Sequence, residues 1–238
     1  MLNIEIIGTS NHNKGAEMML LTILQELKSP ERRFIFQPIS LIDGYEFYSP
    51  LNLYPKAYIG IRGVDLSFLF RLLPSRLIKR YGLYFNSDID VVLDSSGFSY
   101  SDQWSNKPAK KFLLKLIKWK KNNIEVIMLP QAFGPFKNKN IRKIIIKIIN
   151  KVNKIYIRDE FSYEYLSELS PLGNSKFEKY PDFTCLLKSK LPRYFNHRIH
   201  QVCIVLNCRM IDKTNSTEEY ISLIIDFINS LKKSNLSP

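Results

Sequence analysis

Residues 89–97 read Ile-Asp-Val-Val-Leu-Asp-Ser-Ser-Gly, a short apolar run that ends in a polar, glycine-containing loop. Such a run is typical of a strand that is buried on both faces of a parallel sheet. An amphipathic helix is predicted over residues 108–121, with Phe112 and Trp119 on its apolar face. A second apolar run follows at residues 124–129 and is closed by Pro-Gln-Ala-Phe-Gly-Pro. Strand, helix and strand in this order predict a β-α-β unit with parallel strands.

The same alternation continues on both sides of this unit. Further strands are predicted at residues 2–7, 34–36 and 154–157, and further helices at residues 18–28, 141–149 and 160–169. The segment 42–62 is poorly patterned, and one or two helices broken near Pro74 are expected over residues 64–84. The predicted fold class is therefore α/β, a Rossmann-like parallel sheet covered by helices on both faces.

A break in the pattern divides the chain. We expect an N-terminal Rossmann-like domain at residues 1–190, a linker at 191–200 where periodicity disappears, and the start of a second α/β domain at 201–238. That last part contains one predicted strand at residues 202–206 and one predicted helix at residues 217–231. A single strand and helix cannot bury their own apolar faces. The expectation is a second domain that this sequence begins and does not finish.

The charge pattern bears on partners. The chain has 35 Lys+Arg against 22 Asp+Glu, a formal charge of +13, but the basic residues are mostly lysines spread along the sequence. No nucleic-acid-binding motif accompanies them, so a solvated basic surface is favoured over a nucleic-acid partner.

The three cysteines lack metal-ligand spacing and an even number for paired disulfides, which predicts reduced, partly buried thiols.

The hydropathy pattern predicts a cytoplasmic protein. The N-terminus lacks the cationic region and long apolar run of a signal peptide. No apolar run reaches the roughly 18 residues that span a bilayer. The nearest candidate for membrane contact is residues 64–73, but Asp65 and Arg71 interrupt it, so a core or interfacial helix is the preferred interpretation.

Ligands of open α/β sheets bind at the carboxyl ends of the strands, which selects the loops that follow the predicted strands. The loop at residues 9–15 leads into a helix N-terminus, where free amides and Lys14 favour an anion, although simple capping by Asn13 explains it equally well. Asp102 could accept a proton from a hydroxyl, or it could cap a turn or a helix. Arg158 could bind a carboxylate or phosphate, or form a structural pair with an aspartate. The histidines show no catalytic or metal-ligating arrangement, and no metal site is expected.

Taken in order, these loops resemble the polysaccharide pyruvyl transferase family. The matching stretches are residues 8–17 (GTSNHNKGAE), 95–97 (SSG), 102–104 (DQW), 129–136 (LPQAFGPF), 157–162 (IRDEFS), 180–182 (YPD) and 205–210 (VLNCRM). Members of that family resemble GT-B glycosyltransferases, with two Rossmann-like domains that face a cleft. The chain departs from them in lacking a segment that corresponds to the donor-binding Arg and catalytic His late in the second domain.

The resemblance implies a function and a set of site residues. Family members transfer a pyruvyl group from phosphoenolpyruvate to two hydroxyls of a sugar in a bacterial surface polysaccharide, without a cofactor or metal. Asp102 would be the base or acceptor-orienting group, and Arg158 a cation that binds the donor. The substrate-binding residues would be Asn11, Asn13, Lys14, Gly15, Ser96, Gly97, Gln131, Gly134 and Arg209.

The implied partner is a sugar or a lipid-linked oligosaccharide, met in the cytoplasm or at the inner face of the membrane through peripheral association. The oligomeric state stays open. Two other functions also stay open from the residues: a nucleotide-sugar glycosyltransferase of GT-B type, and a non-catalytic fragment that binds a sugar or phosphate.

Overall fold

The computed structural model describes residues 1–10, 13–37, 45–58, 60–61, 64–188, 190–196, 198–199 and 201–236. For residues 45, 47, 60–61, 64–65, 172–174 and 208–209 it describes the backbone alone. The chain divides into two compact units, Met1–Leu187 and Lys188–Pro238. Asn11 and the three histidines lie outside the described residues.

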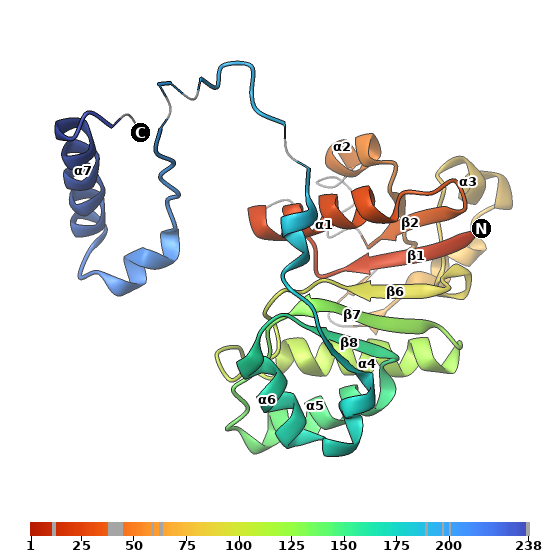
Figure 1. The fold of residues 1–238 in the computed structure, drawn as a ribbon. Helices are drawn as coiled ribbons and strands as arrows, with labels where there is room; N and C mark the ends of the chain where they lie inside the picture. The colour runs from red at the N-terminus through yellow and green to blue at the C-terminus, as the bar shows by residue number, and fades with distance from the viewer. Residues whose placement is uncertain are drawn as a thin grey trace. The chain divides into compact units, whose positions relative to one another are not determined.

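A parallel sheet forms the centre of the first unit (Figure 1). Among the described residues its seven strands lie in the order β3-β2-β1-β6-β7-β8-β9, and every neighbouring pair is parallel. The strands are β1 (Leu2–Ile7), β2 (Arg32–Phe36), β3 (Tyr54–Pro55), β6 (Val91–Asp94), β7 (Glu125–Gln131), β8 (Lys154–Ile157) and β9 (Phe177–Lys179). A small antiparallel pair joins β4 (Gly60–Ile61) to β5 (Val64–Asp65). The predicted α/β, Rossmann-like fold is confirmed.

Helices cover the sheet. They are α1 (Lys14–Leu27), α2 (Tyr45–Tyr48), α3 (Ser75–Arg80), α4 (Lys107–Lys121), α5 (Lys139–Lys151) and α6 (Glu160–Leu169). Shorter 3-10 helices are η1 (Ser49–Leu51), η2 (Ser67–Leu72), η3 (Asn86–Asp88), η4 (Pro171–Lys176) and η5 (Phe183–Leu186). The break near Pro74 falls between η2 and α3, as the sequence predicts, because proline cannot continue a helix hydrogen-bond ladder.

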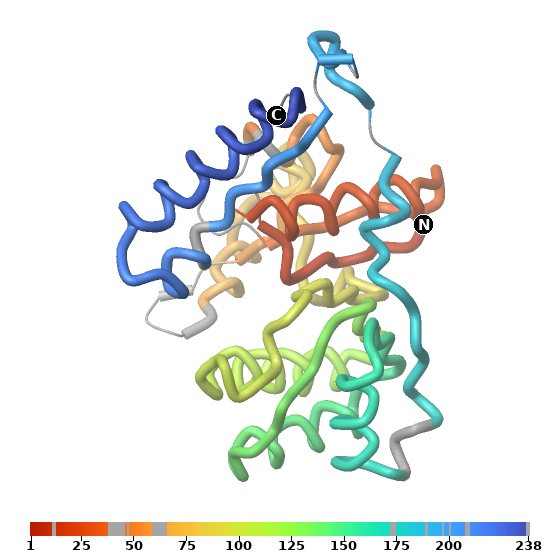
Figure 2. The backbone as a smooth tube through the Cα atoms, turned by 60° about the vertical axis from the view of Figure 1, so that its left-hand side comes forward, coloured from red at the N-terminus to blue at the C-terminus, as the bar shows by residue number. Residues whose placement is uncertain are grey.

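The two faces of the sheet pack against different helices. Ile4 and Ile6 of β1 join a core that includes α1, whereas Val92 of β6 joins a larger core with the apolar faces of α4 and α5. Successive strand side chains point to opposite faces, so the central strands β1, β2, β6 and β7 contribute to both cores. Figure 2 follows the chain from β1 and α1, in red, to the yellow-green part of the chain that contains β6, which pairs directly with β1.

Strands β3 and β9 were missed because they are short. Two-residue β3 lies in the segment that has no clear periodicity, and β9 is a three-residue strand, Phe-Glu-Lys, with two exposed polar side chains. Pairing with a neighbouring strand, rather than local hydrophobic pattern, makes these segments extended.

Cys185 and Cys203 are free and exposed, so the prediction of partly buried thiols is wrong for both.

The second unit contains the 3-10 helix η6 (Cys208–Lys213) and the helix α7 (Thr217–Lys233), which confirms the predicted helix. The prediction of a strand at residues 202–206 is wrong: within the described chain this segment forms no ladder. A strand needs a partner to satisfy its backbone groups.

Across the described residues, no helix is both long and apolar enough to cross a membrane.

Candidate functional site

The sheet order reverses between β1 and β6. From β1 the chain moves through β2 to β3 on one side, and from β6 it moves through β7 and β8 to β9 on the other. Loops that leave the two central strands therefore diverge at their carboxyl ends, and this divergence is where open α/β sheets hold ligands. The loops after β1, β6, β7 and β8 all lie at this carboxyl end of the sheet, which we call the divergent edge.

Gly8 and Ser96 bring the loops after β1 and β6 together. The backbone N–H of Ser95 donates to the carbonyl of Ile7 at 3.0 Å, and the Ser95 hydroxyl donates to the same carbonyl at 3.1 Å. Gly8 has φ +81°, and a β-carbon there would lie 2.5 Å from the Ser96 nitrogen. Gly97 also has positive φ, at +68°. The two predicted residues Ser96 and Gly97 therefore lie at the divergence of the central loops.

A buried carboxylate, Asp94, organises this edge. Its Oδ1 accepts a hydrogen bond from the Ser96 hydroxyl at 2.5 Å, and its Oδ2 accepts from the Tyr100 hydroxyl at 2.9 Å and from Gln131 Nε2 at 3.2 Å. Asp94 and Gln131 are fully buried. Within the described chain, the second amide atom of Gln131, Oε1, has no hydrogen-bond partner. The predicted residues Ser96 and Gln131 are thus joined through a residue that the sequence analysis did not single out.

Asp94 could have been found from its position. It is the last residue of β6, a polar side chain at the end of an apolar strand, directly where the fold rule places ligands. Burial raises the pKa of Asp94, and the hydrogen bonds from Ser96, Tyr100 and Gln131 oppose that shift. Burial and the neighbouring Asp94 charge raise the pKa of Tyr100 well above its usual value, so Tyr100 stays a hydrogen-bond donor at neutral pH.

The variant Asp94→Asn is expected to lower the free energy of unfolding by about 1–3 kcal/mol, because its NH2 group replaces one of the two oxygens that accept hydrogen bonds from Ser96, Tyr100 and Gln131. The loss should depend on pH. A folded-state pKa above that of an unfolded aspartate means that the folded protein binds more protons between the two values, so wild-type stability falls as pH rises through that interval. The deficit of the variant should therefore be largest in acid and shrink as pH rises. Urea unfolding at a series of pH values measures it, with exposed Asp226→Asn as control. A deficit that grew with pH would contradict this account.

The loop after β7 is fixed against the loop after β6. The backbone N–H of Ala132 donates to the carbonyl of Gly97, and that of Gly134 to the carbonyl of Tyr100, both at 2.9 Å. Gly134 has φ +76°, and a β-carbon there would lie 2.4 Å from Cδ2 of Tyr165. The predicted residue Gly134 thus has a packing reason to be glycine, since no side chain fits between the loop and α6.

Asp102 is held by the beginning of the α5 segment. Its carboxylate accepts hydrogen bonds from the backbone N–H of Lys137 and, at 3.2 Å, from that of Asn138. The backbone N–H of Asp102 donates to the carbonyl of Pro135 at 3.1 Å. These contacts fasten the loop after β6 to the loop after β7. Asp102 is only partly buried, so the carboxylate remains next to solvent at this edge.

Arg158 lies one residue beyond β8. Its Nη1 donates to Oδ2 of Asp182 at 3.1 Å, and 31% of the Arg158 side chain and 35% of the Asp182 side chain are exposed. The backbone N–H of Arg158 donates to the carbonyl of Gln131 at 3.3 Å, which places it beside the end of β7. A guanidinium carries five N–H donors, and Asp182 takes one. Arg158 therefore forms the predicted structural pair with an aspartate, while binding of a ligand by its remaining donors stays a prediction.

The loop after β1 caps a helix. The side chain of Asn13 accepts from the backbone N–H of Gly15 at 2.9 Å and from that of Ala16 at 3.3 Å. Lys14 forms an ion pair with Glu17 at 2.6 Å, and 85% of its side chain is exposed. Asn13 therefore performs the predicted capping, while ligand contact by Asn13, Lys14 and Gly15 stays a prediction. Arg209 lies on η6 in the second unit, and its side chain is outside the described residues.

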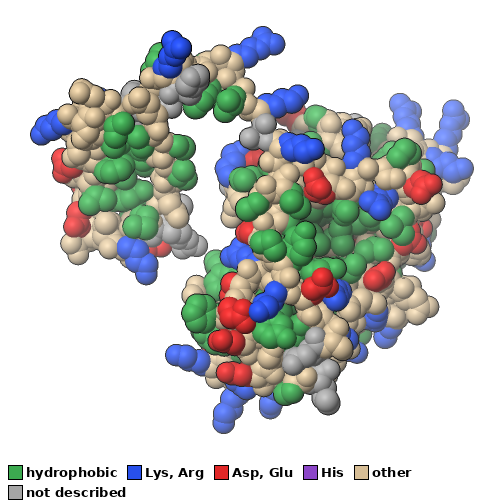
Figure 3. Space-filling view, viewed as in Figure 1, with side chains coloured by type: hydrophobic (Ala, Val, Ile, Leu, Met, Phe, Trp, Pro, Cys, Tyr) green, Lys and Arg blue, Asp and Glu red, His purple; other side chains and the backbone are tan. Residues whose placement is uncertain are grey.

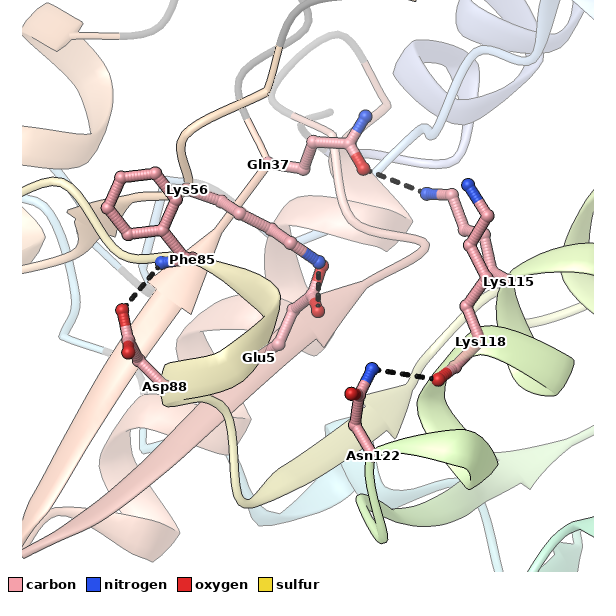
Figure 4. A network of polar contacts seen from close by, with 8 residues as sticks. All are labelled: Glu5, Gln37, Lys56, Phe85, Asp88, Lys115, Lys118 and Asn122. Atoms are coloured by element: carbon pink, nitrogen blue, oxygen red, sulfur yellow. Dashed lines mark hydrogen bonds and ion pairs between the residues drawn. The ribbon is translucent and has the colours of Figure 1, made fainter. Parts of the chain in front are cut away.

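A pocket of about 160 Å³ lies beside the ends of β1 and β2. Its lining includes Gly8, Thr9, Gln37, Tyr48 and Lys115. Lys115 of α4 donates to Oε1 of Gln37 at 2.8 Å (Figure 4). The sequence analysis singled out neither residue. Lys115 lies in the middle of a lysine-rich helix, where nothing in the sequence sets it apart from its neighbours.

Figure 4 also shows a buried ion pair between the segment that follows β3 and strand β1. Lys56 Nζ lies 2.6 Å from Glu5 Oε2, and the side chains are 5% and 0% exposed. The second carboxylate oxygen of Glu5 has no hydrogen-bond partner among the described residues. Loss of either partner would leave a buried charge uncompensated, so the pair ties the segment after β3 to β1.

Another pocket, of about 290 Å³, lies between α1 and the β7–β9 part of the sheet. Its lining includes the apolar residues Ile23, Leu27, Leu129 and Phe183. It is larger than the pocket at β1 and β2, but it offers few polar groups to orient a substrate. In the described part of the chain, no three His, Cys, Asp or Glu side chains gather closely enough to hold a metal ion.

Comparison with known proteins assigns the chain to a family. A model of the polysaccharide pyruvyl transferase family matches residues 13–237. No curated protein and no solved structure matches the chain. The match begins at Asn13, at the end of the loop after β1, and covers the loops after β6, β7 and β8 and the second unit, in agreement with the resemblance that these loops carry. The chain belongs to the polysaccharide pyruvyl transferase family.

Proposed function

We propose that this protein transfers a pyruvyl group from phosphoenolpyruvate to two hydroxyls of one sugar, forming a cyclic ketal and releasing phosphate. The observation that carries the proposal is the family match over residues 13–237. The partly exposed guanidinium of Arg158 at the carboxyl end of β8 supports it, because a donor with a carboxylate and a phosphate needs a cation at this edge.

The proposed reaction balances without an added oxidant or reductant. Two acceptor oxygens form bonds to C2 of the enol, and the bond from C2 to the phosphate oxygen breaks. Of the two hydroxyl protons, one is taken up overall by the methylene carbon, which becomes a methyl group, and one by the departing phosphate. The protein's task is to deprotonate a hydroxyl, protonate the methylene carbon and stabilise the anionic donor.

We assign these tasks to residues of the divergent edge. Arg158 binds the carboxylate or phosphate of the donor through the donors that Asp182 does not use. Asp102 accepts a proton from, or orients, an acceptor hydroxyl. The loop at residues 11–15, with Lys14, contacts the ligand, together with Ser96, Gly97, Gln131, Gly134 and Arg209. No cofactor or metal takes part in this proposal.

The proposed acceptor is a sugar of a bacterial surface polysaccharide or its lipid-linked precursor, as in exopolysaccharide synthesis. Such a precursor would be met in the cytoplasm at the inner face of the membrane. A sugar acceptor follows from a family that modifies polysaccharides.

The proposal is tested by incubating the purified chain with phosphoenolpyruvate and a panel of sugars. Phosphate release and a ketal adduct detected by mass spectrometry are the expected results. Asp102→Asn should lower kcat by about 10²- to 10⁴-fold, with the KM for phosphoenolpyruvate little changed. A purely structural Asp102 would instead lower the melting temperature with normal turnover per folded molecule. Absence of both donor binding and turnover would exclude this activity for the chain, while the family assignment would stand.

A further inference from the structure

A solvent-exposed apolar ridge lies on η2. Phe68 and Leu72 are 61% and 79% exposed, and Leu69 and Leu73 are 41% and 37% exposed. A 3-10 helix has three residues per turn, so Leu69 and Leu72 form one row, and Phe68 and Arg71 form the next. The third row, Ser67 and Phe70, is partly buried against the domain. Large apolar side chains that gather on a surface in this way mark a contact site.

The neighbouring helix α3 adds positive charge to this ridge. Arg76, Lys79 and Arg80 are exposed, whereas Leu77 and Ile78 are partly buried. Residues 66–87 contain four Lys or Arg and no Asp or Glu. Figure 3 shows Lys and Arg side chains projecting from the end of the first unit where Figure 1 draws α3. We name the set of Phe68, Leu69, Leu72, Leu73, Arg71, Arg76, Lys79 and Arg80 the η2–α3 surface.

We propose that the η2–α3 surface docks on an anionic phospholipid bilayer. Apolar side chains flanked by cations are what an interfacial segment presents: the apolar groups enter the acyl boundary while the cations meet lipid phosphates. A second copy of the chain fits less well, because two such surfaces facing each other would oppose their positive charges. A nucleic acid also fits less well, because the most exposed side chains of the ridge, Phe68 and Leu72, are apolar and the phosphate backbone offers them no partner.

Docking would leave the candidate site open. Figure 1 draws α3 at the end of the sheet where β1 and β6 begin, whereas the loops of the divergent edge lie where these strands end. The surface therefore shares no residue with the candidate site. The inference goes beyond the proposed function, because it concerns the surface on which the protein is held and not the acceptor that it uses. Vesicle binding is measured without donor or acceptor, so its failure and the failure of transfer are separate results.

The test is co-sedimentation of the purified protein with vesicles of phosphatidylcholine and phosphatidylglycerol, and with vesicles of phosphatidylcholine alone. Binding should require phosphatidylglycerol and weaken as salt is raised. Arg76→Glu with Lys79→Glu should lower the partition coefficient at least tenfold, since each removed cation alone accounts for roughly a fivefold change. Phe68→Ser with Leu72→Ser should also lower it at least tenfold.

Matched controls come from the α4 and α5 helices. Lys143→Glu with Lys147→Glu makes the same change in net charge at exposed positions of α5, and Leu114→Ser removes a 57% exposed leucine of α4. Both controls should bind vesicles within about threefold of wild type. An equal loss in the α5 control would overturn the proposal, because general charge attraction and not the η2–α3 surface would then bind the lipid.

A spectroscopic readout separates insertion from general attraction. Phe68→Trp should show a blue-shifted emission with vesicles and quenching by brominated lipid, whereas Leu114→Trp should show neither. Each of three other results would overturn the proposal: binding to neither vesicle, binding to an RNA or DNA oligonucleotide without vesicle binding, and a dimer that the Phe68→Ser with Leu72→Ser variant abolishes.

Discussion

Replacing Gly8 by alanine is expected to lower the free energy of unfolding by about 2–5 kcal/mol. This loss is the sum of two costs: holding an L-residue in the left-handed backbone conformation and overpacking the contact with Ser96. The new β-carbon would lie 2.5 Å from the nitrogen, 2.6 Å from Oγ and 2.7 Å from Cα of Ser96. Two of these atoms belong to the backbone, so no side-chain rotation relieves the contact. The loops after β1 and β6 would have to separate.

Urea unfolding followed by circular dichroism measures this loss. Gly15→Ala is the matched control, because Gly15 lies in α1 and its β-carbon would meet only the Asn13 side-chain oxygen, at 3.3 Å. Alanine favours a helix over glycine, so the control should stay within about 1 kcal/mol of wild type. A Gly8 variant as stable as this control would mean that the two loops separate easily, and the close approach of Gly8 to Ser96 would lose its structural role.

Replacing Arg158 by alanine is expected to lower kcat/KM for phosphoenolpyruvate by about 10²- to 10³-fold. Removing a single group that stabilises developing charge has an effect of this size in other enzymes. The proposed cause is loss of the guanidinium fork that holds the donor, and calorimetry should show weaker phosphoenolpyruvate binding even without acceptor. Arg158→Lys should recover only part of the affinity, because an ammonium group keeps the charge and not the paired geometry.

Asp182→Asn separates the two roles of Arg158. It weakens the 3.1 Å ion pair and leaves the guanidinium in place. Both residues are about one-third exposed, so the pair itself should contribute little stability, in the range of about 0–1 kcal/mol. If Arg158→Ala and Asp182→Asn reduced donor affinity equally, Arg158 would act through the ion pair, and its role as the donor-binding cation would be wrong.

The family loops and most of the fold could be predicted from the sequence. The strand at residues 89–93 and the helix at 108–121 have apolar patterns that reflect burial on a sheet, and such patterns are local. The loop residues Ser96, Gly97 and Gln131 follow from the rule that parallel strands gather their carboxyl ends. The short strands β3 and β9 and the unpaired segment 202–206 could not be predicted this way, because pairing depends on a neighbour.

The long-range contacts among the loops of the site were not readable from the chain. Asp94 meets Gln131 across 37 positions, and Asp102 meets the Lys137 amide across 35 positions. Only pairing of β6 with β7 brings these groups together. The exposure of Phe68 and Leu72 depends in the same way on which surfaces the rest of the fold covers.

The sequence by itself determined the alternation of strands and helices, the loops at the carboxyl ends and the family that they resemble. The tertiary structure decided which carboxylate is buried, which cation stays open beside its partner and which apolar segment faces solvent. The physical reason is range: periodicity and turn chemistry act over a few residues, whereas burial and hydrogen-bond partners are set by segments that are distant in the chain.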